Sequence, residues 1–90
     1  MKTKENVWSI VRKNIRKIKP QLFDRDISEQ YDFAEDYGFD LIDAIELSEY
    51  CAGDLMIDVS FYDVNTSKTV GEFVALLCNR CCAKAEKMCV

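Results

Sequence analysis

Apolar residues recur at helical spacing along three segments of this 90-residue chain, and no segment sustains the alternation of a β-strand. With only three Gly and one Pro, few positions interrupt a helix. A chain of this length forms one core, so we expect a single domain over residues 1–90. The predicted fold is an all-α, four-helix bundle with a long first loop and a short third helix.

The first helix is predicted from Thr3 to Lys19. Its apolar positions follow spacings of three and four, and Lys and Arg fill most other positions: Val7, Ile10, Val11, Ile15 and Ile18. Pro20 ends the helix, because the residue before a proline is pushed out of the helical conformation. The acidic connection from Gln21 to Phe39 carries apolar residues that can attach it to the core: Leu22, Phe23, Ile27, Tyr31, Phe33 and Tyr37.

The second helix is predicted to begin at Asp40 or Leu41. Asp40 is a good N-cap, and the carboxylate of Asp43 is favoured in the first turn by the free backbone amides. We expect Gly53 to end the regular part of this helix. The residues expected to face inward are Ile42, Ile45, Cys51, Ala52 and Leu55.

The remaining helices follow from their start signals. A short turn is predicted at Phe61 to Val64, and Thr69 with Glu72 forms a capping box that opens the last helix. Phe73, Val74, Leu77 and Cys81 are expected to face inward, and a cysteine-rich tail over residues 78–90 extends the helix.

Charge is divided sharply along the chain. Residues 1–20 carry seven Lys or Arg and one acid, whereas residues 21–63 carry one Arg and thirteen acids. The amino end resembles a transit peptide in this respect, but its apolar stripe is needed to complete the core. An acidic surface repels phosphate backbones, so we expect a protein partner with a basic patch and no nucleic acid. The longest apolar run, Phe73 to Cys78, is too short to cross a bilayer, which favours a soluble protein with no membrane partner.

Five cysteines are an odd number, which argues against a disulfide framework and favours a reducing cytoplasm. Four of them lie in the tail, where Cys78, Cys82, Ala85 and Cys89 share one helical stripe. This pattern favours packing, with a helix interface or intermolecular disulfide as one alternative and metal or redox chemistry as another. His is absent and the tail lacks two separated pairs of ligands, so we predict no metal.

The residues around the second helix resemble the acyl and peptidyl carrier proteins. That family has a turn similar to Asp-Leu-Gly-x-Asp, then Ser-Leu and a helix with spaced acids and aliphatics, and later Thr-Val before the last helix. The corresponding residues here are Phe33, Asp36, Tyr37, Gly38, Asp40, Leu41, Ile42, Asp43, Ile45, Glu46 and Leu47, with Thr69, Val70 and Gly71 at the expected separation. The resemblance covers residues 5–78 and implies a carrier-type bundle.

Leu41 stands where the family has the serine that anchors phosphopantetheine. A hydrocarbon side chain has no nucleophile, so we expect no phosphopantetheine arm and no other cofactor. Ser48 is one alternative attachment residue, although it lies about 10 Å farther along the helix. Cys51 is another, although its apolar neighbours favour a buried residue. A serine replaced by design at position 41 is a third.

The resemblance implies that acids of the second helix bind basic grooves on partner enzymes. The candidate partner-binding residues are Asp36, Asp40, Leu41, Asp43, Glu46 and Glu49, with Leu41 as an apolar anchor among the acids. The alternative is a solvated acidic face carrying an ordinary surface leucine. Ala52 and Gly53 stand where the family often has further acids, which shortens the acidic face.

Two functions follow from these residues, and no enzyme activity is predicted, because the chain has no His, no serine beside a base and no glycine-rich phosphate loop. The first is a non-catalytic interaction or adaptor module that binds a basic partner enzyme through the second helix. The alternative is a genuine carrier of fatty acid, polyketide or nonribosomal peptide biosynthesis whose serine is replaced by Leu41 or lies elsewhere. A thiol or metal protein that uses the tail is a third hypothesis.

Overall fold

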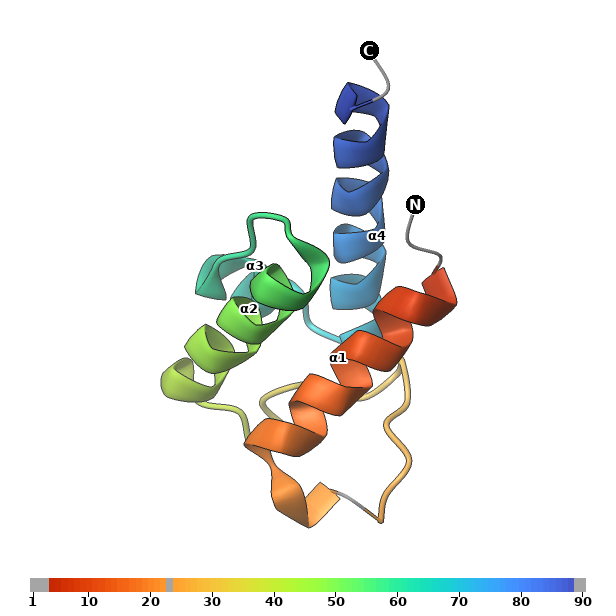
Figure 1. The fold of residues 1–90 in the computed structure, drawn as a ribbon. Coiled ribbons are helices and arrows are strands. Elements are labelled where there is room, and N and C mark those ends of the chain that lie inside the picture. The colour runs from red at the N-terminus through yellow and green to blue at the C-terminus, as the bar shows by residue number, and fades with distance from the viewer. Residues whose placement is uncertain (1–3, 23, 89–90) are drawn as a thin grey trace.

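The computed structural model describes residues 4–22 and 24–88, and their side chains as far as Ala83. Its elements are α1 (Lys4–Ile18), the 3₁₀-helix η1 (Pro20–Leu22), α2 (Leu41–Leu55), α3 (Phe61–Thr66) and α4 (Val70–Met88) (Figure 1). The predicted all-α fold, with its long first loop and short third helix, is confirmed. Thr3, Phe23 and Cys89, named above, lie outside the described residues.

The helices surround one apolar core. Helix α1 contacts both α2 and α4, and α3 packs on α2. The carboxyl-terminal turns of α4 extend beyond the other helices (Figure 1), and the molecule measures 43 × 23 × 20 Å. Within the described part of the chain, no helix has the length and apolar character needed to span a membrane.

Helix α1 buries the stripe that its spacing predicts. Val7, Val11 and Ile15 are fully buried, and Ile10 and Ile18 pack against the core from its edge. The same face also buries Asn14, which the apolar pattern did not indicate. Its side-chain amide donates to the Asp54 carboxylate at 3.1 Å and to the Cys51 sulfur at 3.6 Å, so a polar contact joins α1 to α2.

The inward face predicted for α2 is wrong at two positions, since Ile42 and Ile45 are exposed. Cys51 and Leu55 are buried as expected, and Ala52 is half-buried. The true stripe follows helical spacing through two small residues: Ala44, Leu47, Ser48, Cys51 and Leu55. Ile45 lies two residues before Leu47 and therefore points to nearly the opposite side of the helix.

Helix α2 also ends later than predicted. Gly53 lies within the helix, and the chain leaves it at Met56, which adopts the left-handed conformation with φ of 56°. The predicted start is confirmed, because Asp40 caps the helix and forms a capping box with Asp43.

The other two helices begin with capping boxes. At α4, the Thr69 hydroxyl accepts from the Glu72 amide at 3.2 Å and the Glu72 carboxylate accepts from the Thr69 amide at 3.2 Å, as predicted. At α3, Asp63 accepts from the Ser60 amide at 2.9 Å. Asp63 also forms a two-point ion pair with Arg80 of α4, at 2.5 and 2.9 Å, which ties α3 to α4.

The long connection is held to the core by aromatic packing. Leu22, Ile27 and three aromatic residues are buried: Phe33, Tyr37 and Phe39. The Phe33 ring lies 5.3 Å from that of Phe39 and 5.7 Å from that of Phe73 in α4. Tyr31 is an exception among the predicted attachment residues, because it is 41% exposed.

The connection also pairs with the start of α4 through its backbone. The Val70 amide donates to the Tyr31 carbonyl and the Gly71 amide to the Glu29 carbonyl, both at 3.0 Å. A Cβ at position 71 would lie 2.9 Å from the Glu29 Cβ and 3.1 Å from the Glu29 oxygen. Glycine is therefore required at 71 by the close approach of two backbones.

Replacing Gly71 with alanine is expected to lower the free energy of unfolding by about 1–2 kcal/mol, because the clash exceeds the helix-propensity gain of the added methyl group. Gly53→Ala is the matched control, since no atom lies within 4 Å of its added Cβ. That variant should gain about 0.5–1 kcal/mol. Urea unfolding measures both, and equal effects at the two sites would contradict the close approach.

Candidate interaction surface on α2 and α3

Large apolar side chains are exposed at the start of α2. Leu41 is 56% exposed, Ile42 64% and Ile45 36%. Leu41 and Ile45 are one helical turn apart and therefore lie in one row on the helix surface. We call these three residues the apolar end of α2. Sequence reasoning assigned Ile42 and Ile45 to the core, although their offset from Leu47 and Cys51 could have indicated the surface.

A second exposed group lies at the other end of α2 and on α3. It consists of Met56, Phe61 and Tyr62, with exposed fractions of 73%, 44% and 65%. The two helices are neighbours (Figure 1). Sequence reasoning did not identify this group, because each residue also fits an ordinary helix end or start.

The predicted acids divide into two kinds. Glu49 is exposed and Glu46 is half-buried, and they follow Ile45 and Ile42 by one turn in the same rows of the outer face. Asp40 is exposed, but its carboxylate accepts from the Asp43 amide at 2.9 Å. Asp36 is exposed in the preceding turn, and its carboxylate accepts from the Asp32 amide at 2.6 Å. Glu46 and Glu49 therefore accompany the apolar end most directly.

Asp43 is directed into the fold. Its carboxylate lies 2.9 Å from the Lys19 ammonium, and the two side chains are only 16% and 20% exposed. It also accepts from the Asp40 amide at 3.2 Å. Burial acts to raise the pKa of Asp43, but the hydrogen bonds from Lys19 and Asp40 outweigh it and hold the pKa below its ordinary value. Asp43 joins the end of α1 to the start of α2.

Asp43→Ala is expected to lower the free energy of unfolding by about 1–2 kcal/mol, because it removes the second half of a capping box and leaves Lys19 without its carboxylate. Glu49→Ala, on the same helix, should change it by less than about 0.5 kcal/mol. Urea unfolding of both variants measures the difference. Equal costs would mean that neither the capping box nor the Lys19 contact contributes measurable stability.

The two alternative attachment residues on α2 are buried. Ser48 is 3% exposed, and its hydroxyl donates to the Ile45 carbonyl at 2.7 Å. Cys51 is fully buried, and burial raises the pKa of its thiol to about 12, although the Asn14 hydrogen bond acts to lower it. A transferase would have to open α2 to reach either group, and the Cys51 thiol stays protonated at neutral pH.

Among the described cysteines of α4, Cys81 belongs to the core and Cys78 packs against it. Cys81 is buried, Cys78 and Cys82 are half-buried, and all three are free thiols. Burial raises the pKa of Cys78, and the neighbouring thiols of Cys81 and Cys82 add to that rise. In the described ranges, no three His, Cys, Asp or Glu side chains are grouped to hold a metal ion. The part of the predicted stripe at Ala85 and Cys89 lies outside the described side chains.

Comparisons with protein-family models, with curated proteins and with solved structures gave no match. The resemblance to carrier proteins accordingly stays a prediction that rests on the residues around Leu41 and Thr69.

Proposed function

We propose that this chain is a carrier-protein-like interaction module that carries no phosphopantetheine and binds a basic surface of a partner protein through the outer face of α2. The resemblance implies a biosynthetic enzyme as the partner, and the cysteine content favours the cytoplasm. One observation supports the proposal most strongly. The apolar end of α2 exposes Leu41, Ile42 and Ile45 at the position where the resembled family presents its attachment serine.

The apolar end can supply binding energy. Covering apolar surface contributes about 25 cal/mol per Å² removed from water, before the costs of association. Residues that dominate an interface lie near its centre, where they are shielded from solvent by surrounding polar contacts. Leu41 and Ile45 suit that central place, because they lie in one row and the acids flank them.

The acidic side chains of α2 can orient a bound partner. Glu49 forms no ion pair with the residues that the structure describes, and it follows Ile45 by one turn. A partner with Lys or Arg around an apolar recess would match this surface in charge. The attraction should weaken as salt rises, because exposed charges are screened.

The proposal is tested by incubating the native chain with coenzyme A and a broad-specificity phosphopantetheinyl transferase and measuring its intact mass. We expect the mass to stay unchanged, since Leu41 has no nucleophile and the hydroxyl of Ser48 is buried. An added phosphopantetheine arm would overturn the proposal and favour the alternative, a genuine carrier whose attachment residue lies elsewhere.

A further inference from the structure

The outer face of α1 carries a groove of about 490 Å³. The described residues that line it all come from this helix and recur at helical spacing on the side opposite the buried stripe: Ser9, Arg12, Lys13, Arg16 and Lys17. Arg12 and Arg16 lie in one row, and Lys13 and Lys17 lie in the neighbouring row. Two rows of cationic side chains therefore follow the groove.

The two arginines are held by contacts outside the groove. The Arg12 guanidinium carbon lies 5.3 Å from the centre of the Trp8 ring, and the Arg16 Nη2 donates to the Arg25 carbonyl at 3.1 Å. The Nε atoms of both arginines are buried and have no hydrogen-bond partner among the described residues. Each guanidinium thus has a donor that the fold leaves unpaired, and a carboxylate is the acceptor that matches a guanidinium best.

The two lysines are directed to α2. The Lys13 ammonium lies 3.2 Å from the Asp54 carboxylate, and the Lys17 ammonium lies 4.2 Å from the centre of the Tyr50 ring. The side chains of Lys13 and Asp54 are 63% and 38% exposed, so this surface pair leaves the ammonium open to a second carboxylate. Because the four cationic ends contact different elements, they lie apart. The groove therefore suits a broad acidic surface better than a single small anion.

Extended polyanions fit this chain poorly. Residues 21–63 carry thirteen acids and one Arg, so the rest of the chain would repel a nucleic acid or an anionic membrane that lay along α1. The apolar stripe of α1 is buried in the core and is not available for insertion into a membrane. A folded protein surface with acids around an apolar side chain is the better match.

The chain itself carries such a surface on α2. Leu41 and Ile45 are exposed in one row, and Glu49 follows Ile45 by one turn. The methylene stems of arginine and lysine can cover an apolar side chain while their charged ends stay in water. The groove of α1 is thus a basic surface of the kind that the outer face of α2 requires.

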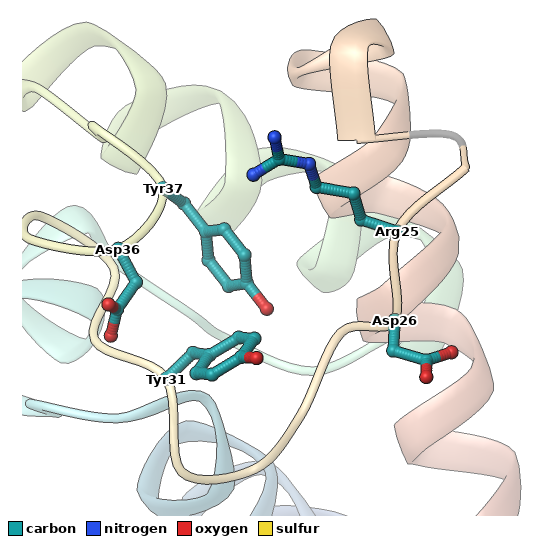
Figure 2. Close-up of a pocket in the computed structure, with 5 residues that line it drawn as sticks. All are labelled: Arg25, Asp26, Tyr31, Asp36 and Tyr37. Atoms are coloured by element: carbon teal, nitrogen blue, oxygen red, sulfur yellow. The ribbon is translucent and has the colours of Figure 1, made fainter.

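The acids of the connection between η1 and α2 form no comparable surface. Figure 2 shows the carboxylates of Asp26 and Asp36 on opposite sides of the pair of Tyr31 and Tyr37, with Arg25 on the same segment. Their negative charge is divided between two directions, and the guanidinium of Arg25 opposes it. The outer face of α2 is therefore the better complement of the groove.

We propose that the chain associates with itself, and that the outer face of α2 in one copy docks on the α1 groove of a second copy. Leu41 packs between the two cationic rows, and Glu46 and Glu49 meet the arginines and lysines. This inference rests on the proposed function of α2 as a binding surface and names one partner for it. The contact joins different surfaces of the two copies, so it is heterologous. The net charge of -4 opposes association, which makes the local charge match decisive.

Sedimentation equilibrium of the native chain tests the association, with a reductant present so that no intermolecular disulfide forms. We expect the average mass to rise with concentration at low salt, and association to be at least about fivefold weaker in about 0.5 M salt. A chain that stays monomeric up to about 1 mM, the affinity of a very weak complex, would overturn this inference. The intact-mass test of the proposed function needs no second copy, so the two can fail separately.

Single charge reversals test each half of the contact. Glu49→Lys on α2 and Lys17→Glu on α1 should each weaken self-association at least about fivefold. Lys13→Glu is a second groove variant, should the loss of the Tyr50 contact unfold the first. Asp24→Lys and Lys68→Glu are the matched controls, because both positions are exposed and lie outside the two surfaces.

Mixing the two variants distinguishes this contact from any other. A ¹⁵N-labelled Glu49→Lys chain keeps the α1 groove, and an unlabelled Lys17→Glu chain keeps the outer face of α2. We expect the amide signals of Ser9 and Lys17 in the labelled chain to shift when the Lys17→Glu chain is added, and to stay in place when more Glu49→Lys chain is added. Equal shifts in the two titrations, or none in either, would overturn the proposal.

Discussion

The Leu41→Ser variant is expected to take up a phosphopantetheine arm on every molecule when it is incubated with coenzyme A and a phosphopantetheinyl transferase. The native chain is expected to stay unmodified under the same conditions. Position 41 is the first residue of α2, its side chain is more than half exposed, and Asp40 before it caps the helix. A serine hydroxyl there would be accessible to the transferase without any change of fold. Intact mass measures the conversion, and Leu41→Ala is the matched control that must stay unmodified.

The same variant can report on the partner surface. In the Leu41→Ser chain, Glu49→Lys should slow modification about fivefold at low salt, because a charge at the edge of an interface acts mainly on association. Glu5→Lys makes the same reversal on α1 and should have no such effect. If serine at 41 is never modified, or if both reversals act alike, the outer face of α2 is not a carrier-type docking surface.

Asp63→Ala is expected to lower the free energy of unfolding by about 2–3 kcal/mol. The variant removes both hydrogen bonds to Arg80 and the cap on the Ser60 amide. The Asp63 side chain is 12% exposed, but that of Arg80 is 37% exposed, so water compensates part of the lost charge pair. Asp24→Ala, at an exposed position of the connection, should cost less than about 0.5 kcal/mol.

The contribution of Asp63 should also depend on pH. Hydrogen bonds from Arg80 hold the pKa of Asp63 below its ordinary value of 3.8 and outweigh the effect of burial. The unfolded chain therefore binds more protons than the folded chain near that pH, and the stabilisation is present above pH of about 4 and lost as the pH falls through the lower, folded value. The difference in unfolding free energy between the native chain and Asp63→Asn should shrink on acidification from pH 7 to pH 2. A constant difference would contradict the ion pair.

Local signals in the sequence predict much of this fold. The stripe of Val7, Val11 and Ile15 and the capping boxes at Asp40 and Thr69 were predicted correctly, because each depends on residues within two helical turns. The inward face of α2 was not. The buried stripe of α2 includes Ala44 and Ser48, whose small side chains carry little hydrophobic signal. Ile42 and Ile45 carry a strong hydrophobic signal but lie on the exposed face of the helix.

Contacts between distant residues could not be read from the pattern. Asp63 and Arg80 are 17 residues apart, and Asn14 and Asp54 are 40 apart. Before the helices are placed, each of these charged or amide groups looks like an ordinary surface residue. The same holds for Asp43, predicted as a partner contact, whose carboxylate is occupied by Lys19. The burial of Tyr37 likewise depends on how the connection packs against the helices.

The ion pair between Lys19 and Asp43 affects how the outer face of α2 is presented. It joins the beginning of α2 to the residue that follows α1 across the whole connection, so Leu41, Ile42 and Ile45 lie next to a contact that the folded chain has already formed. A preorganised surface loses little conformational freedom when it is covered. For the proposed interaction module, selection among partners would then depend on how well their shape and charge match this surface.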